Sequence, residues 1–224
     1  MIFQRTSLIA VVAAVGVAAL VPAAIAHGHA ATGHHAVHHA GSHASHYTGT
    51  AGDDTYAGTA GKDLARGLAG NDTLSGAAGR DKLFGGAGDD ILSGDAGRDQ
   101  VWGGDGNDTI TGGDDRDTLR GGAGNDNISG DAGNDHIWGG AGDDTMTGGD
   151  GNDRIWAGTG TDSLSGGAGN DFLYAAANDG LVDTVDCGDG NDRAVVREGD
   201  TTTGCETVVT IKADGTHEVT RPTS

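Results

Sequence analysis

The sequence predicts an all-β fold, a solenoid of two thin sheets, and three regularities of the chain indicate it. A nine-residue frame runs without a slip through residues 49–174, which makes fourteen tandem copies. The eighth position of the frame is apolar in every copy. The ninth position alternates between small and large residues from one copy to the next, so the true period is eighteen residues. This alternation is explained if two copies make one turn of the solenoid and successive copies lie on opposite sides of it.

The frame also explains how each copy forms a turn and a strand. Positions one and four are glycine in all copies except one each, where Ala157 and Asp115 stand instead. Glycine permits backbone angles that other residues avoid, and it lets carbonyl groups approach one another. Positions seven to nine then form a short strand whose middle residue points inward. One inward apolar residue per copy makes no core alone, so the copies are expected to stack into a ladder.

Position six is Asp in all fourteen copies. Stacked copies place one such carboxylate in every layer, and a column of carboxylates repels itself unless a counter-ion is present. Carboxylates together with convergent backbone carbonyls are hard oxygen ligands, which suit calcium. The periodic acidity therefore predicts a series of calcium sites.

The frame resembles the repeats-in-toxin (hemolysin-type) calcium-binding β-roll, whose motif is G-G-x-G-x-D-x-U-x. The resemblance covers about 126 of the 224 residues. It implies a right-handed parallel β-roll in which calcium lies between adjacent turns on the same side, held by position-six carboxylates and turn carbonyls. It implies several calcium ions, up to about twelve. The metal ligands that it implies are Asp72, Asp81, Asp90, Asp99, Asp108, Asp117, Asp126, Asp135, Asp144, Asp153, Asp162 and Asp171.

Composition and charge limit the possible partners. The chain holds 44 Gly, only 4% aromatic residues and a net charge of −20, which by composition alone indicates a disordered chain. So acidic a chain repels nucleic acid and anionic membranes, and we expect neither as a partner. Because the Asp residues are periodic, the acidity is interpreted as a calcium-binding feature rather than a merely solubilising surface.

Residues 1–26 resemble a secretory signal peptide. Arg5 supplies the positive end, residues 8–21 the apolar run, and residues 24–26 a small-x-small cleavage site. The alternative is a membrane anchor, for which the apolar run is short. We expect a secreted protein that keeps no integral membrane segment once the signal is removed.

Residues 27–48 form a His-rich segment among Ala, Gly and Ser, without a periodic apolar face, and are expected to be disordered. Clustered imidazoles bind zinc, copper or nickel, which makes transition-metal capture one hypothesis for this segment. The alternative is a polar spacer. The histidines are His27, His29, His34, His35, His38, His39, His43 and His46.

The two outer faces of the roll are expected to differ. Position nine is small, mostly Ser or Thr, in odd copies, as solvent-facing strand residues often are; a flat array that matches ice is the alternative. In even copies it forms a ladder of large residues, which suggests a surface for a glycan, a protein or another copy of the chain. The alternative is a ladder that stabilises the sheet by stacking. Its members are Arg66, Phe84, Trp102, Arg120, Trp138, Trp156 and Tyr174.

Two further irregularities bear on calcium. Position five is cationic in four even copies, at Lys62, Arg80, Arg98 and Arg116, and a cation beside a calcium site weakens it. Alternatively, these cations offset the acidic columns, at about 1 kcal/mol or less each. In the first two copies position two is Thr instead of Gly, and we expect an N-terminal cap that binds calcium poorly.

Residues 175–224 are expected to form a C-terminal cap on the roll. The frame breaks at residues 175–185 and returns once at residues 187–195. Cys187 and Cys205 are the only cysteines, and in an exported chain they most simply form one disulfide. Residues 207–220 have the pattern of a hairpin around the turn 213–215.

No catalytic motif occurs in the chain, so we expect that it is not an enzyme. The main hypothesis is a secreted calcium-binding β-roll, residues 49–174, whose folding is coupled to calcium loading. The first alternative is an extracellular adhesion module that uses the Arg/aromatic ladder. The second is transition-metal capture by residues 27–48.

Overall fold

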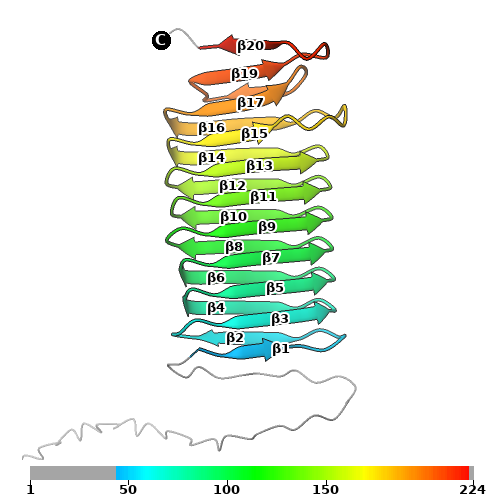
Figure 1. Cartoon of the computed structure of the whole chain (residues 1–224), viewed down its shortest axis with the longest axis vertical. Helices are drawn as coiled ribbons and strands as arrows, with labels where there is room; N and C mark the ends of the chain where they lie inside the picture. The colour runs from blue at the N-terminus through cyan, green and yellow to red at the C-terminus, as the bar shows by residue number, and fades with distance from the viewer. Residues whose placement is uncertain (1–43, 222–224) are drawn as a thin grey trace, which may run out of the picture. The chain divides into compact units, whose positions relative to one another are not determined.

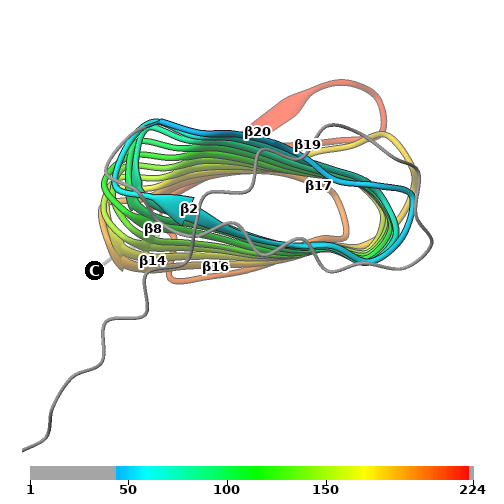
Figure 2. The same cartoon turned by 90° about the horizontal axis from the view of Figure 1, so that it is seen from below.

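The structure is a computed structural model that describes residues 44–221. These residues form strands and no helix, and the strands lie in two sheets that face each other (Figures 1 and 2). The chain alternates between the sheets, so each strand pairs with the strand two places along the sequence. All neighbours within residues 44–221 are parallel except β19 and β20. The predicted parallel β-solenoid is therefore confirmed.

Sheet A has eleven strands and sheet B has nine within the described residues. Sheet A contains β1 (His46–Thr48), β3 (Leu64–Ala69), β5 (Lys82–Ala87), β7 (Gln100–Asp105), β9 (Thr118–Ala123), β11 (His136–Ala141), β13 (Arg154–Thr159), β15 (Phe172–Ala175), β17 (Arg193–Arg197), β19 (Thr207–Ile211) and β20 (His217–Thr220). Sheet B contains β2 (Thr55–Thr59), β4 (Thr73–Gly79), β6 (Ile91–Gly97), β8 (Thr109–Asp114), β10 (Asn127–Ala132), β12 (Thr145–Asp150), β14 (Ser163–Gly169), β16 (Thr184–Gly190) and β18 (Thr201–Thr203).

The strands of the repeats are longer than the three residues predicted. Most run for six residues, from position seven of one copy to position three of the next, as β8 does. The extension follows from position one, where a glycine such as Gly112 is buried and faces inward as the residue at position eight does. Paired residues are eighteen apart, as in the register of Val101 with Leu119, so the eighteen-residue period is confirmed.

The core is two ladders of apolar side chains, one from the inner face of each sheet. Each layer contributes one position-eight residue per sheet, and almost all of them are fully buried. Burying a Leu or Ile side chain stabilises the fold by about 1.5–3 kcal/mol, which the stack repeats layer after layer. Sheet A contributes Tyr47, Ala65, Leu83, Val101, Leu119, Ile137, Ile155, Leu173 and Ala194; sheet B contributes Tyr56, Leu74, Leu92, Ile110, Ile128, Met146, Leu164 and Val185.

The solenoid begins earlier than the repeat frame indicated. Residues 27–48 were expected to be disordered, but β1 pairs with β3, so that expectation is wrong for residues 46–48. Tyr47 occupies the inward position and stacks on Tyr56 with ring centroids 4.8 Å apart. The backbone N–H of Ser45 donates to Asp63 Oδ1, which continues the stack by one layer. The predicted signal peptide and the His-rich segment up to residue 43 lie outside the described residues.

The C-terminal end closes with a hairpin. β19 continues sheet A in parallel with β17, and β20 then turns back antiparallel to β19. A salt bridge of 2.8 Å between Lys212 Nζ and Glu218 Oε2 spans this turn. Cys187 and Cys205 form the expected disulfide, which joins β16 to the segment before β19.

Candidate metal-binding columns

Two columns of carboxylates run along the solenoid, one at each edge where the chain passes between the sheets. Position-six Asp residues supply them, and each of these side chains is at most 3% exposed. Residues eighteen apart belong to the same column. The first column contains Asp54, Asp72, Asp90, Asp108, Asp126, Asp144 and Asp162; the second contains Asp63, Asp81, Asp99, Asp117, Asp135, Asp153 and Asp171.

From Asp72 to Asp171, each carboxylate is held by the layer before it. Its Oδ1 accepts the backbone N–H of the Asp eighteen residues earlier, as Asp108 Oδ1 accepts the N–H of Asp90 at 2.9 Å. The same bond recurs along both columns at 2.7–2.9 Å. One oxygen of each of these twelve carboxylates is therefore fixed, and this bond sets the direction of the second oxygen.

The second oxygen of these carboxylates has no partner. Within residues 44–221, Oδ2 of each of the twelve predicted metal ligands, from Asp72 to Asp171, is buried and receives no hydrogen bond. The one ion pair among these residues joins Lys212 and Glu218, so no Lys or Arg neutralises a column carboxylate directly. A buried carboxylate oxygen without a donor or a counter-ion is costly. Twelve of them in regular layers indicate that a cation completes the structure.

Position-one glycines keep the space beside these oxygens open. A Cβ atom added to Gly85 would collide with Oδ2 of Asp90, and one added to Gly103 would collide with Oδ2 of Asp108. A carbonyl oxygen of the next layer lies close to the same point, as Gly121 O does for Gly103. The glycine at this position therefore leaves room where oxygen atoms converge.

Burial raises the pKa of the column carboxyls, and neighbouring carboxylates raise it further. The pKa of Asp72, Asp90 and Asp108 rises to about 6. In the middle of the stack the pKa of Asp144 rises to about 7 and that of Asp117 to about 8. Without a cation, the folded columns thus resist full ionisation at neutral pH.

The donor set fits calcium. Within residues 44–221 no group of three or more His, Cys, Asp and Glu side chains is placed to hold a metal ion. A cation at a column would therefore combine carboxylate oxygens with backbone carbonyls. In the turn between β5 and β6, the carbonyls of Gly88 and Asp89 accept no hydrogen bond from the described residues. Such all-oxygen sets suit calcium rather than transition metals.

In the first two copies, protein groups donate hydrogen bonds to the Oδ2 atom instead. Asp54 Oδ2 accepts hydrogen bonds from Thr50 N at 2.5 Å and Thr50 Oγ1 at 3.0 Å. Asp63 Oδ2 accepts the same pair from Thr59, at 2.6 and 3.0 Å. Threonine at position two thus supplies donors at the oxygen that stays unpartnered in later copies, as a cap that needs no cation would.

The columns continue past the repeats, where the sequence interpretation did not place them. Asp183 and Asp192 take the next rungs, accepting the N–H groups of Asp162 and Asp171 at 2.9 and 2.7 Å. Their spacing of 21 residues falls outside the frame, which is why the pattern missed them. Asp192 stands at position six of the returning copy, a signal that was present in the sequence. Its Oδ2 is also buried without a partner.

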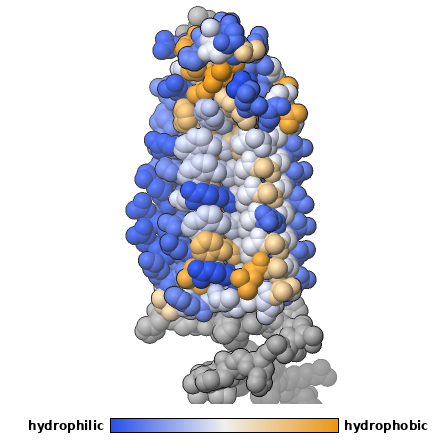
Figure 3. Space-filling model, turned by 45° about the vertical axis from the view of Figure 1, so that its right-hand side comes forward, coloured by the Kyte–Doolittle hydropathy of each residue, from blue (hydrophilic) through white to orange (hydrophobic). Residues whose placement is uncertain are grey.

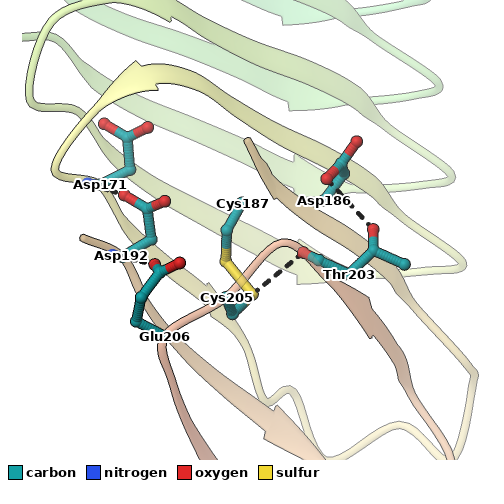
Figure 4. Close-up of a disulfide and its surroundings, with 7 residues drawn as sticks. All are labelled: Asp171, Asp186, Cys187, Asp192, Thr203, Cys205 and Glu206. Carbon is teal, nitrogen blue, oxygen red and sulfur yellow. Dashed lines mark hydrogen bonds between the residues drawn. A yellow bond between two sulfur atoms is a disulfide. The ribbon is translucent and has the colours of Figure 1, made fainter. Parts of the chain in front are cut away.

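Glu206 ends the second column. Its Oε2 accepts the N–H of Asp192 at 2.7 Å (Figure 4). The disulfide between Cys187 and Cys205 lies beside this rung, because Cys205 directly precedes Glu206. The crosslink therefore anchors the segment that carries the last acidic rung.

The Arg/aromatic ladder forms in register on the outer face of sheet A. Phe84 and Trp102 stack at 4.4 Å between ring centroids, and Trp138 and Trp156 stack at 4.8 Å. The guanidinium carbon of Arg120 lies between the two pairs, 5.8 Å from the Trp102 ring and 4.4 Å from the Trp138 ring. Figure 3 shows a pale band of intermediate hydropathy along this side of the stack. Because the ring faces cover one another, the geometry favours a stabilising role over a partner-binding one.

The outer face of sheet B carries the small position-nine residues. Ser75, Ser93 and Thr111 stand in register on neighbouring strands.

No helix among the described residues is long and apolar enough to cross a membrane.

Comparison with known families agrees with this geometry. The family described as the RTX calcium-binding nonapeptide repeat matches overlapping segments that together extend over residues 48–194. No curated protein matches the chain.

Proposed function

The chain belongs to the RTX calcium-binding nonapeptide repeat family, and from this premise we propose that it is a secreted calcium-binding protein whose roll folds as it takes up calcium. The observation that carries the proposal is the unpartnered Oδ2 atom in twelve successive copies, from Asp72 to Asp171. These carboxylates, with backbone carbonyls of the turns, would hold the ions. Bound calcium would supply the positive charge that the columns lack.

The coupling to folding follows from the weakness of the roll without cations. Each layer buries only two apolar side chains, and it brings two carboxylates against those of the next layer. In a solenoid each repeat contacts only its neighbours, so stability is a sum of local terms. Binding energy that is available only to the folded chain becomes folding energy. We infer that the calcium-free chain is expanded at neutral pH and that successive turns close as ions bind.

The proposal places the protein outside the cell and gives it no catalytic role. The signal-like residues 1–26 and the disulfide both agree with an oxidising compartment. The columns offer a repeated cation-binding unit rather than a single site with distinct acid and base groups.

Calcium removal and restoration test the proposal. Circular dichroism and size-exclusion chromatography, with EGTA and with excess calcium, should show an expanded chain that becomes a compact β-rich one. The variant Asp108→Asn, Asp126→Asn removes two central ligands and should require more calcium to fold. The control Asp105→Asn, Asp150→Asn removes the same charge from exposed positions and should fold as the wild type does. A chain that stays compact and protease-resistant in EGTA at physiological salt would contradict the proposal.

A further inference from the structure

A row of four cations stands at the edge where β2, β4, β6 and β8 end, on the left in Figure 1. They are eighteen residues apart, one in each of four successive layers, with neighbouring strands about 4.8 Å apart. All four side chains are exposed, and none forms an ion pair within the described residues. Such a row is unusual in a chain of net charge −20. Its members are Lys62, Arg80, Arg98 and Arg116.

The row occupies position five of the repeat frame. In the other turns of the solenoid, the side chain at position five is a hydrogen-bond acceptor. At the opposite edge, Asn71 Oδ1 accepts the N–H of Asp89 at 3.0 Å, and Asp89 Oδ1 accepts the N–H of Asn107 at 2.7 Å. The cationic edge returns to this pattern later, where Asn134 Oδ1 accepts the N–H of Asn152 at 2.7 Å. Position five is therefore normally a self-satisfied ladder of Asn and Asp side chains.

The four cationic layers interrupt this ladder of Asn and Asp side chains. At position five they present only hydrogen-bond donors. Lys and Arg side chains accept no hydrogen bond. Within residues 44–221, the backbone N–H groups of Arg80, Arg98 and Arg116 accordingly have no partner. Exposed guanidinium and ammonium groups thus line this edge, and the backbone donors of three of its layers are unused. An array of this kind is complementary to oxyanions.

Two shallow, open hollows border the row. One, of about 190 Å³, is lined by Lys62, Arg80, Lys82 and Arg98 together with Asp81 and Gln100. The other, of about 400 Å³, is lined by Arg98 and Arg116 together with Asp115, Gly133 and Asn134. Arg98 borders both, so the hollows adjoin and five cations contribute to them.

We propose that this edge binds a linear acidic polysaccharide, one that carries carboxylate or sulfate groups along a single extended chain. The row is one cation wide and several layers long, so its shape matches a single extended polymer chain better than a flat surface such as a membrane. Three of its four members are Arg, whose planar forks bind flat oxyanion groups in a bidentate manner. The inference is independent of the calcium proposal.

The competing explanation is that the cations only offset the buried carboxylates beside them. The charge of Arg116 acts on Asp135 in this way. An offsetting role gives no affinity for an external polyanion, so binding separates the two explanations.

The test uses the full, calcium-loaded chain and the triple variant Arg80→Asn, Arg98→Asn, Arg116→Asn. Asn is the residue that this edge carries in its later layers, so the variant extends an existing ladder. The control triple Arg154→Asn, Arg193→Asn, Arg221→Asn removes the same charge elsewhere. The probes are dextran sulfate and hyaluronate, which separate sulfate from carboxylate recognition, with neutral dextran as the blank. Near-ultraviolet circular dichroism checks that each variant folds.

We expect the wild type and the control to bind at least one acidic polymer in a salt-sensitive way. The row variant should lose about tenfold or more in affinity. Absence of binding by the wild type, or an equal loss in both triple variants, would overturn the proposal. So would tighter binding to single-stranded DNA or to phosphatidylserine vesicles with the same dependence on the row, because the partner would then be of another class.

Discussion

The backbone N–H of Asp192 donates to Glu206 Oε2 at 2.7 Å, which ends a column of such bonds that begins at the N-terminal end of the solenoid. Glu206 reaches this position from a segment that the disulfide of Cys187 and Cys205 holds in place. The last rung of the column thus depends on a crosslink, whereas the earlier rungs depend on the repeat.

Removal of this disulfide should weaken the C-terminal end. We expect Cys187→Ser, Cys205→Ser to lose about 3 kcal/mol in urea unfolding at saturating calcium, because the crosslink restricts a loop of 18 residues in the unfolded chain. Calcium titration should also show weaker binding, because the last acidic rung loses its anchor. A reducing agent should affect the wild type alone; an equal effect on the double variant would show that the loss has another origin.

Acid should stabilise the calcium-free roll. Burial raises the pKa of Asp108 to about 6 and that of Asp117 to about 8, from 3.8 in the unfolded chain. The folded state therefore binds protons more tightly, so its stability is greatest below about pH 4 and falls as pH rises through 6 to 8. In EGTA we expect more β structure at pH 4.5 than at pH 7.5 by circular dichroism.

When calcium is present, the pH dependence of stability is reversed. Protons and calcium compete for the column carboxylates, so calcium affinity should fall as pH falls from about 7.5 to 5. The variant Asp117→Asn should raise calcium-free stability at pH 7.5, because it removes a carboxylate whose pKa is raised to about 8. A calcium-free roll that is most stable at pH 7.5 would be inconsistent with buried, unpaired columns.

The inward glycines give a test of the space beside the carboxylates. Gly103→Ala should destabilise the calcium-loaded protein by about 1–3 kcal/mol, because the added Cβ meets Asp108 Oδ2 and the carbonyl of Gly121. Gly52→Ala is the matched control, since a Cβ there has nothing within 4 Å. Urea unfolding measures both. Equal stability of the two variants would mean that position one does not protect the column.

Substitution of the cationic row should strengthen calcium binding at that edge. Arg98→Asn with Arg116→Asn removes two charges beside the column that contains Asp99 and Asp117. Isothermal titration calorimetry should show tighter binding, with Arg154→Asn as the single-charge control. Unchanged affinity would mean that these side chains swing clear of the column.

Much of the solenoid follows from the sequence because its information is periodic. Position eight identifies the inward residue of both sheets, and position six identifies every column carboxylate within the frame. The strand length was underestimated, because a buried Gly at position one leaves no apolar signal. The outer rungs were missed for a different reason. Ser45 and Glu206 are not Asp, and Asp183 stands at an irregular spacing, as does Asp200, whose Oδ1 accepts the N–H of Asp183 at 3.0 Å. These ends are fixed by tertiary contacts, which a nine-residue frame does not encode.

The Arg/aromatic ladder gives the last prediction, which separates stabilisation from partner binding. Trp138 stacks on Trp156 and accepts the guanidinium of Arg120 on its other face, so both faces of its ring are occupied. Trp138→Ser removes a ring stack and a cation–π contact, and should lower the stability of the calcium-loaded protein by about 1–3 kcal/mol in urea unfolding.

Trp138→Phe should recover most of that loss, because a smaller ring still stacks. Thr145→Ser, an exposed substitution on sheet B, should leave stability unchanged. The wild-type sedimentation mass should be that of a monomer, and Trp138→Ser should not alter it, since covered ring faces offer little to a second chain. A mass that falls from dimer to monomer in Trp138→Ser, with stability intact, would instead assign the ladder to self-association.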